Sequence, residues 1–355
     1  MELTDLGFNI FFEKFITENK LENFVTGRVV EEHKERYKVR TQTNEYEAEI
    51  IGNLRFTAKN REDFPAVGDW VLLTTYDENF AIIQKILPRF SIIKRQAVGQ
   101  VGDVQVIATN IDYAFIVQAV DRDFNINRLE RYLTICNASK VNPIILLSKS
   151  DLFHQDWIDE LTITLKNRIK DVPVIAISNE TQLGYNELKA IIEKGKTYCL
   201  LGSSGVGKST LLNNLTGKKI MKTDSISVST NKGRHVTSHR ELIILENGGI
   251  LIDNPGMREV GIVDATGGLE ITFRKIVEYA QNCKYKDCTH TNESGCAVIK
   301  AVENGYIDRA SYKNYLKMER EKAHFESTVE EKRKKDKDFG KFINNYKKVM
   351  KKNKF

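Results

Sequence analysis

Residues 202–209 have the residue types and spacing of a phosphate-binding loop. They read Gly-Ser-Ser-Gly-Val-Gly-Lys-Ser, which fits the pattern G-x-x-x-x-G-K-S. The glycines let the backbone curl until its N–H groups point at phosphate oxygens, while Lys208 can reach the outer phosphates and Ser209 can bind Mg²⁺. An apolar run at 199–201 and a leucine-rich helix pattern after the loop supply the expected flanks. The alternative is a glycine-rich turn that matches by chance.

The predicted phosphate site extends beyond the side chains of Lys208 and Ser209. It comprises Gly202, Ser203, Ser204, Gly205, Val206, Gly207, Lys208, Ser209 and Thr210. Backbone N–H groups of this loop and the N-terminus of the following helix both attract phosphate.

A second set of polar residues follows an apolar run at 143–147. These residues are Ser148, Lys149, Ser150 and Asp151. A carboxylate at Asp151 can accept two hydrogen bonds from the N1–H and N2–H₂ edge of guanine, a donor pair that adenine lacks. We expect the Lys149 stem to lie along the base. Ser178, after a third apolar run, stands where a backbone N–H can meet guanine O6. The alternative is a solvated lysine and a helix-capping aspartate.

Two polar segments downstream of the phosphate loop resemble nucleotide-sensing switches. The first contains His235 and Thr237, and the second ends a strand with Asp253-Asn-Pro-Gly256. Thr237 and Asp253 are candidate magnesium ligands, and the N–H of Gly256 can sense the γ-phosphate. Met257 stands where many GTPases place a water-orienting glutamine, so we expect slow basal hydrolysis. His235 is a candidate to orient the water, and an exposed histidine without that role is the alternative.

The order of these pieces along the chain is unusual. Lys149 and Asp151 precede the phosphate loop, whereas in an ordinary GTPase the base-reading residues come last. A circularly permuted chain can build the same sheet in this order. The second switch then leads directly into the C-terminal region.

A cluster of soft ligands lies near the C-terminus. Cys283, Cys288, His290 and Cys296 follow the spacing C-x₄-C-x-H-x₅-C. Three thiolates and one imidazole suit tetrahedral Zn²⁺, and four protein ligands leave no open position for chemistry. We therefore expect one structural zinc ion, with small buried cysteines as the alternative. Cys136 and Cys199 are expected in the core.

The elements that must hold these residues fall into separate parts of the chain. Phe8, Phe11, Phe12 and Phe15 predict an N-terminal helix with one apolar side. Five short runs of period two between residues 24 and 88 predict a small barrel such as an OB-fold, an oligonucleotide binder, with a ligand-free SH3-like barrel as the alternative. From about residue 107, apolar strands alternate with helices, which predicts a mostly parallel, doubly wound sheet.

Composition and charge limit the class of protein and its partners. The net charge is +6, but residues 332–355 carry 11 Lys/Arg against 2 Asp/Glu. This basic tail on a nearly neutral body favours an RNA partner, and a solvated tail is the alternative. The N-terminus lacks the pattern of a secretory signal, and no run approaches the ~20 apolar residues of a membrane span. We expect a cytoplasmic protein, because clustered cysteines suit metal binding in a reducing compartment.

Taken together, these motifs resemble the circularly permuted YjeQ/RsgA family of GTPases that depend on the small ribosomal subunit. The resemblance covers nearly the whole chain and implies three parts: an N-terminal OB-fold, a central permuted GTPase with a phosphate loop, and a C-terminal helical zinc domain. It places the boundaries at residues 1–22, 23–90, 91–262 and 263–355, the first being a helical extension. Two positions depart from the family pattern. Ser148 replaces the commonest asparagine, and Thr237 lacks neighbouring threonines.

The resemblance also implies an activity and partners. It implies GTP hydrolysis to GDP during late maturation of the 30S subunit, stimulated by that subunit, with contacts to 16S rRNA, zinc and magnesium as cofactors, no membrane partner and a monomeric state. Two rival functions remain at this stage. One is an RNA-binding assembly module with a static, non-hydrolysing nucleotide site, and the other is an ATP-using small-molecule kinase.

Overall fold

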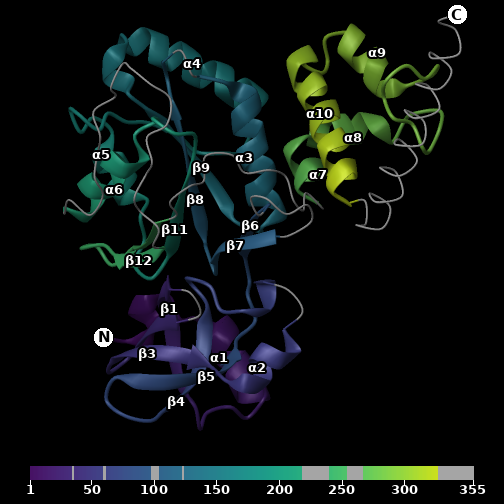
Figure 1. The fold of residues 1–355 in the computed structure, drawn as a ribbon. Helices are drawn as coiled ribbons and strands as arrows, with labels where there is room; N and C mark the ends of the chain where they lie inside the picture. The colour runs from purple at the N-terminus through teal and green to yellow at the C-terminus, as the bar shows by residue number, and fades with distance from the viewer. Residues whose placement is uncertain are drawn as a thin grey trace, which may run out of the picture.

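The computed structural model describes residues 1–33, 36–58, 61–96, 104–121, 124–217, 240–253 and 267–326. Figure 1 shows three parts: a barrel near the N-terminus, a central sheet flanked by helices, and a C-terminal group of helices beside that sheet. Within the described ranges, no helix is both long and apolar enough to cross a membrane.

Five strands close the barrel. Their order is β1-β2-β3-β5-β4, and a further pairing of β1 with β4 completes the ring. Only β3 and β5 are parallel neighbours, and a bulge interrupts the pairing of β1 with β2. The bounds are β1 (Val25–His33), β2 (Arg36–Thr41), β3 (Glu45–Ile50), β4 (Trp70–Thr75) and β5 (Phe80–Ile86). Burial alternates along β2 and β3, as a barrel with a filled interior requires, so the predicted OB-like barrel is confirmed.

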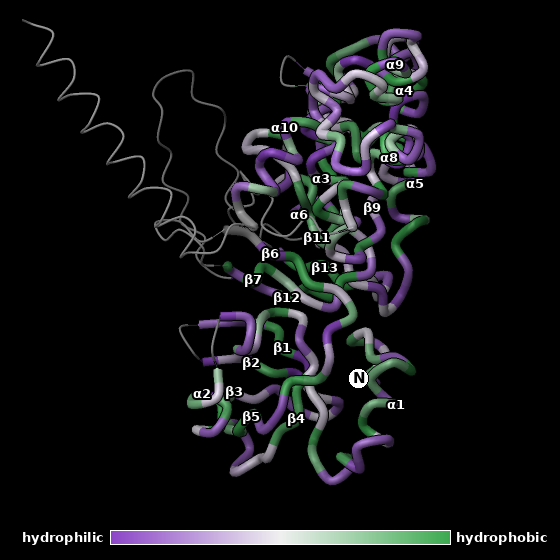
Figure 2. Tube along the Cα trace, turned by 90° about the vertical axis from the view of Figure 1, so that its right-hand side faces the viewer, coloured by the Kyte–Doolittle hydropathy of each residue, from purple (hydrophilic) through white to green (hydrophobic). Residues whose placement is uncertain are grey.

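The N-terminal segment packs on the side of this barrel. A 3₁₀ turn η1 (Leu3–Leu6) precedes α1 (Ile10–Glu18), whose first turn is capped by the Asn9 side chain. Phe12 is buried with its ring centroid 5.7 Å from that of Trp70 on β4. Figure 2 shows α1 lying along the barrel. The expectation of one apolar side holds for Phe12 but not for Phe11, which is 42% exposed.

Two short elements, α2 (Gly52–Thr57) and η2 (Arg61–Asp63), connect β3 to β4 within the barrel. Two strands, β6 (Ile92–Gln96) and β7 (Val104–Thr109), lead from the barrel to the central part. Strands β6 and β7 form a separate antiparallel pair. The sequence pattern did not predict this pair.

The central sheet has the order β10-β9-β8-β11-β13-β12. All neighbours are parallel except β12, which is antiparallel to β13. The bounds are β8 (Tyr113–Ala119), β9 (Asn142–Ser148), β10 (Val174–Ala176), β11 (Thr197–Leu201), β12 (Glu241–Ile244) and β13 (Ile250–Asp253). Strand β11, which enters the phosphate loop, lies between β8 and β13. Because these three strands are parallel, the loops that follow them meet at the same edge of the sheet.

Helices cover both faces of this sheet. Leu129 and Leu133 of α3 and Ile158 of α4 belong to one buried cluster, whereas Leu188 of α5 and Leu211 of α6 belong to another. The bounds are α3 (Ile126–Ala138), η3 (Ser150–Leu152), α4 (Gln155–Arg168), α5 (Tyr185–Ala190) and α6 (Lys208–Thr216). The predicted doubly wound arrangement is confirmed.

A smaller group of helices follows the sheet. It comprises α7 (Gly268–Thr272), α8 (Arg274–Ala280), α9 (Ala297–Glu303) and α10 (Arg309–Glu326). Its own core contains Phe273, Ile276, Val298 and Met318. Helix α7 lies so close to α3 that a Cβ on Gly268 would be 2.3 Å from the carbonyl oxygen of Thr134.

Candidate functional site

The phosphate loop joins β11 to α6 in a conformation that needs its glycines. Gly202, Gly205 and Gly207 have φ of +148°, +81° and +94°. A Cβ at Gly202 would lie 2.3 Å from the carbonyl oxygen of Val117, so a side chain would also push the loop off β8. The turn is therefore fixed by both backbone conformation and packing.

Lys208 folds back over this loop. Its Nζ donates to the carbonyl oxygens of Gly202 and Ser203, the first at 2.7 Å. Ser209 and Thr210 stand in the first turn of α6, and the side chains of both are partly exposed. A cation above curled backbone amides at a helix N-terminus is the arrangement that binds phosphates.

The loop after β9 touches the phosphate loop directly. The buried Ser148 hydroxyl donates to the carbonyl oxygen of Val206 at 2.7 Å. Lys149 adopts a left-handed backbone with φ of +61°, and its Nζ pairs with Asp121 at 2.7 Å. The serine at this position thus makes a bond across 58 residues of sequence.

The two residues that follow differ in exposure. The Ser150 hydroxyl is buried and has no hydrogen-bond partner among the described residues. Asp151 is exposed in the 3₁₀ turn η3, so its carboxylate is accessible from solvent.

The loop after β10 uses Ser178 in its own turn. The backbone N–H of the buried Ser178 donates to the carbonyl oxygen of Leu183 at 3.0 Å. Its hydroxyl accepts the N–H groups of Glu180 and Thr181. Because the loop's own turn occupies the Ser178 N–H, a donor to guanine O6 at this place would be another backbone N–H of the loop or the Ser178 N–H released from Leu183.

Sequence reasoning did not single out Asn179 and Arg128, which also reach the phosphate loop. Asn179 Nδ2 donates to the carbonyl oxygen of Gly207, and Arg128 Nη1 on α3 donates to the Ser203 hydroxyl at 2.9 Å. The available signal for Asn179 was its place after a buried strand, next to Ser178. Nothing in the helical pattern of α3 points to Arg128.

The switch residues are only partly within the described chain. Asp253 ends β13, next to the strand that enters the phosphate loop. His235, Thr237 and Gly256 lie outside the described residues.

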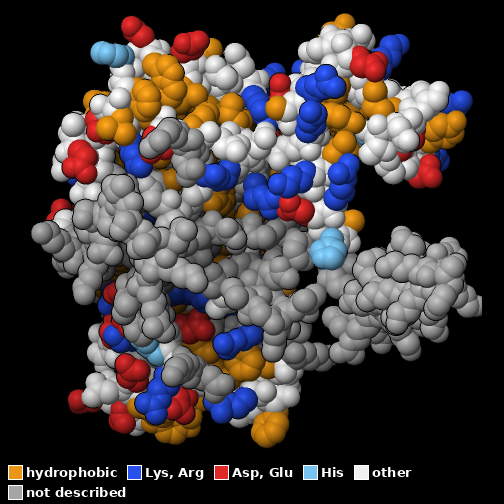
Figure 3. All heavy atoms as spheres, turned by 45° about the horizontal axis from the view of Figure 1, so that its top comes forward, with side chains coloured by type: hydrophobic (Ala, Val, Ile, Leu, Met, Phe, Trp, Pro, Cys, Tyr) orange, Lys and Arg blue, Asp and Glu red, His pale blue; other side chains and the backbone are white. Residues whose placement is uncertain are grey.

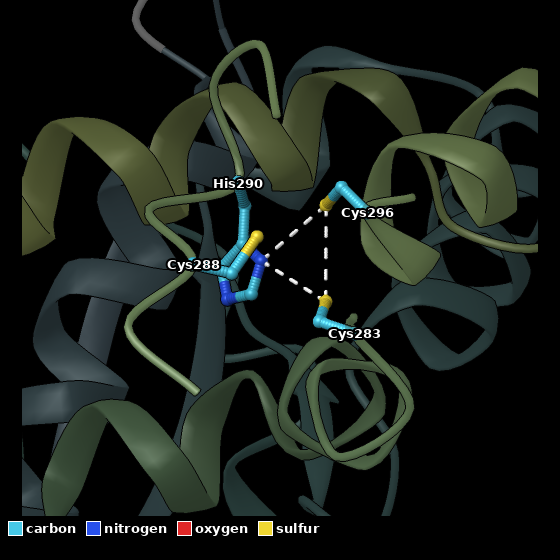
Figure 4. Close-up of side chains that lie close together, drawn as sticks. All are labelled: Cys283, Cys288, His290 and Cys296. Carbon is cyan, nitrogen blue, oxygen red and sulfur yellow. Dashed lines mark hydrogen bonds between the residues drawn. The ribbon is translucent and has the colours of Figure 1, made fainter. Parts of the chain in front are cut away.

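The four predicted metal ligands converge between α8 and α10 (Figure 4). One ligand atom from each of Cys283, Cys288, His290 and Cys296 lies within 4.8 Å of the others. His290 Nδ1 is 3.6 Å from Cys283 Sγ and 3.5 Å from Cys296 Sγ, and these two sulfurs are 3.9 Å apart. A tetrahedral ion with Zn–S of about 2.3 Å and Zn–N of about 2.0 Å separates its sulfurs by about 3.8 Å and sulfur from nitrogen by about 3.5 Å. The donor set therefore fits one metal ion.

Neighbouring groups favour the metal-binding form of two of these ligands, whereas burial raises the pKa of the Cys288 thiol to about 11. Burial lowers the pKa of His290, which favours the neutral imidazole that ligates metals. Burial opposes ionisation of Cys283, but N–H groups of Val298 and Ala297 at the start of α9 outweigh it and lower the thiol pKa. The Ile299 N–H donates to Cys296 Sγ, and the Tyr312 hydroxyl donates to the His290 carbonyl.

The other two cysteines are fully buried in the central part, as expected. Burial raises the pKa of both Cys136 and Cys199. They are inert core residues at neutral pH.

The fold and the phosphate loop define a class: a circularly permuted phosphate-loop GTPase. A family model described as RsgA GTPase matches residues 86–263. The chain belongs to the RsgA GTPase family and is a GTP hydrolase. A model described as ABC transporter matches residues 185–349, a range that includes the phosphate loop common to both kinds of nucleotide hydrolase.

Curated relatives and solved structures agree with this family. "Small ribosomal subunit biogenesis GTPase RsgA 1" of Bacteroides thetaiotaomicron is 40% identical over 96% of this chain and 94% of its own length. RsgA of Opitutus terrae is 39% identical over 91% of this chain and 90% of its own length. The crystal structure of YjeQ from Thermotoga maritima has a TM-score of 0.62 at 25% identity, covering 84% of this chain and 98% of its own. The crystal structure of YloQ, described as a circularly permuted GTPase, has a TM-score of 0.61 at 24% identity. The match covers 86% of this chain and 98% of YloQ.

Proposed function

We propose that this GTPase binds the 30S ribosomal subunit and assists its late maturation, hydrolysing GTP in a step that the subunit stimulates. One structural observation carries the nucleotide site: the Ser148 hydroxyl, beside the base-reading Lys149 and Asp151, is bonded to the phosphate loop at Val206. Two segments that are remote in sequence thus form one pocket edge for a guanine nucleotide. The RsgA relatives are named small ribosomal subunit biogenesis GTPases, which supports the subunit as the partner.

Each part of the nucleotide has a proposed set of residues. Asp151 accepts the guanine N–H groups, and the loop from Gly202 to Gly207 donates backbone N–H groups to the phosphates. Lys208 leaves its loop carbonyls to neutralise the outer phosphates. Ser209, Asp253 and Thr237 hold Mg²⁺, whose chemistry is to neutralise charge that develops on the β- and γ-phosphates. Gly256 reports the γ-phosphate, and His235 orients the attacking water.

The C-terminal cluster is proposed as a structural zinc site. The spacing between the ligand atoms supports tetrahedral coordination, and three sulfurs with one imidazole nitrogen favour zinc over magnesium or calcium. The ion would fix the loop between α8 and α9 without taking part in hydrolysis.

Two features support contacts with 16S rRNA: the Lys and Arg side chains of this protein and its OB-like barrel. Figure 3 shows Lys and Arg side chains gathered in a band across one face of the central and C-terminal parts. Residues 332–355 add a net charge of +9 from 11 basic and 2 acidic residues. Phosphate neutralisation by such surfaces binds RNA without reading its sequence. We place the protein in the cytoplasm as a monomer, with parts at residues 1–22, 23–90, 91–262 and 263–355.

The test is GTP turnover by the purified protein with and without salt-washed 30S subunits. Lys208→Ala provides the blank, and ATP is the parallel substrate. We expect strong stimulation by 30S subunits that is confined to GTP. GTP binding without stimulation would contradict the proposal and favour a static RNA-binding module, while equal use of ATP would favour a kinase-like enzyme. His235→Ala, assayed next, should lower the stimulated rate and leave GTP binding unchanged.

A further inference from the structure

Two consecutive carbonyl groups of the phosphate loop are held by the two loops that follow β9 and β10. The carbonyl of Val206 accepts the Ser148 hydroxyl at 2.7 Å, and that of Gly207 accepts Asn179 Nδ2 at 3.0 Å. Both donors come from outside the phosphate loop and its helix. The loop is therefore fixed at these two peptide groups from the base-reading side.

Holding a carbonyl fixes the next amide. A peptide group is planar and trans, so its N–H points opposite to its C=O. The bond to the Val206 carbonyl therefore sets the direction of the Gly207 N–H. In the same way, the Gly207 carbonyl sets the direction of the Lys208 N–H. It accepts the Leu211 N–H of α6 at 2.9 Å, and the bond from Asn179 adds a second donor that fixes it from outside the helix. These amides belong to the curled part of the loop, where N–H groups cradle the phosphates.

The Asn179 side chain is itself held in place. Its Oδ1 accepts the hydroxyl of Tyr185 at 2.8 Å, and Tyr185 is only 4% exposed. Asn214 on α6 donates both to the Asn179 carbonyl and to the Tyr185 hydroxyl, each at 3.0 Å. These bonds set which way the Asn179 amide faces, so that its NH₂ group is directed at the phosphate loop.

Gly207 is adapted to this neighbour. An ideal Cβ on Gly207 would lie 2.5 Å from Asn179 Nδ2, and the Gly207 φ of +94° already disfavours other residues. Absence of a side chain lets the amide of Asn179 approach the backbone closely. The glycine and the asparagine thus form a matched pair across 28 residues of sequence.

We propose that Asn179 is a positioning residue that aims the Lys208 N–H at the β-phosphate and so links the base-reading loop to phosphate binding. The inference rests on the nucleotide site proposed above. It assigns to Asn179 no contact with the guanine edge. Loss of its side chain should therefore weaken binding of the β-phosphate and leave the choice of base unchanged.

The experiment compares the affinities of GDP, GMP and ADP for Asn179→Ala in the full-length protein. Glu180→Ala is the matched control, because Glu180 is the next residue of the same loop and is exposed. We expect Asn179→Ala to lose about tenfold in GDP affinity, the effect of one hydrogen bond to the loop, with GMP affinity nearly unchanged. The preference for GDP over ADP should persist. Tyr185→Phe should shift the GDP-to-GMP ratio in the same direction by a smaller factor.

Different results separate the possible failures. Equal losses for GDP and GMP would show a purely structural role, and a reduced preference for GDP over ADP would show a role in base reading. Either result would overturn the inference while leaving the guanine site intact. If Asn179→Ala does not fold, an unchanged GDP-to-GMP ratio in Tyr185→Phe would overturn it. If the wild-type protein and Glu180→Ala both fail to bind GDP, the nucleotide site itself is wrong.

Discussion

The central part of the molecule meets its two neighbours through opposite buried charges. Toward the barrel, the guanidinium of Arg28 on β1 is 1% exposed. Toward the C-terminal helices, the carboxylate of Glu130 on α3 is 3% exposed. Each charge collects hydrogen bonds from several separate segments. At the barrel, this contact stands beside the pairing of β1 with β12 and the packing of Val30 and Val67 into the buried cluster of the sheet.

The Arg28 contact is made mainly with backbone. Its guanidinium donates to the carbonyl oxygens of Leu6, Gly68 and Asn110 and to the Thr197 hydroxyl, over distances of 2.6–3.1 Å. Burial lowers the arginine pKa to about 10, while nearby carboxylates oppose that change. The side chain therefore stays charged at neutral pH and ties the N-terminal segment, the barrel and β11 together.

The Glu130 contact is made with side chains. Its carboxylate accepts two bonds from Arg168 on α4, one from Ser311 and one from Asn314 on α10. Because side-chain donors can turn away whereas backbone carbonyls cannot, the comparison teaches that the barrel contact is the more rigid one. The C-terminal contact can loosen with a smaller loss in the free energy of unfolding.

The largest expected effect follows removal of the proposed zinc ion. The C-terminal core is small, and domains of this size usually need a staple such as a metal ion. Chelation, or Cys296→Ser, should unfold the C-terminal helices while the barrel and the sheet stay folded. Hydrogen exchange read separately for residues 267–326 and 1–121 checks this. Equal protection of residues 267–326 with and without metal would contradict it.

Breaking the Arg28 contact should cost the next most. Arg28→Met leaves three buried carbonyls without this donor, partly offset because a charge is no longer buried, so we expect a loss of about 3 kcal/mol in the free energy of unfolding. Denaturant unfolding measures the loss. Arg28→Lys, which keeps the charge and some donors, should lose less. A Met variant as stable as the wild type would show that the contact is not needed.

Breaking the Glu130 contact should cost somewhat less. Glu130→Gln keeps an acceptor but loses the charge, and Arg168 retains Asn127 and Asp308 as partners. We expect a loss of about 2 kcal/mol in the free energy of unfolding. Proteolysis near α10 should become faster, while proteolysis in the barrel should not change. Faster proteolysis in the barrel would reverse the ranking of the two contacts.

The smallest effect is expected at the surface of the same contact. Arg131 on α3 and Glu321 on α10 pair at 2.7 Å with partly exposed side chains. Arg131→Ala should cost under about 1 kcal/mol, because solvent screens such pairs. A loss as large as that of Glu130→Gln would show that the partly exposed pair, and not the buried carboxylate, holds α10.

Much of this architecture follows from local sequence pattern. The period-two runs predicted all five barrel strands. Helix α3 illustrates the predicted alternation of strands and helices, because the Asn125 side chain caps it and its leucines are buried. The spacing from Cys283 to Cys296 predicted the group of four possible metal ligands, because a short loop brings its own side chains together. Such features depend on residues that are close in sequence.

What could not be predicted depends on residues that are remote in sequence. Arg28 lies in an alternating strand, where nothing marks a buried guanidinium. The Asn179 bond to Gly207 appears only when β10 and β11 are in one sheet. The bond from the Ser178 N–H to the Leu183 carbonyl belongs to a turn that the apolar pattern does not reveal.

The most direct test of the whole arrangement is the base preference of Asp151→Asn. Xanthine carries a carbonyl where guanine carries the N2 amino group, so an asparagine amide can donate where the aspartate accepts. The account predicts that the variant loses GDP affinity by about two orders of magnitude or more, because the guanine N2 amino group then faces an amide donor in place of an acceptor, and gains affinity for XDP. Unchanged GDP binding would contradict it, because Asp151 and the phosphate loop would then not share one nucleotide.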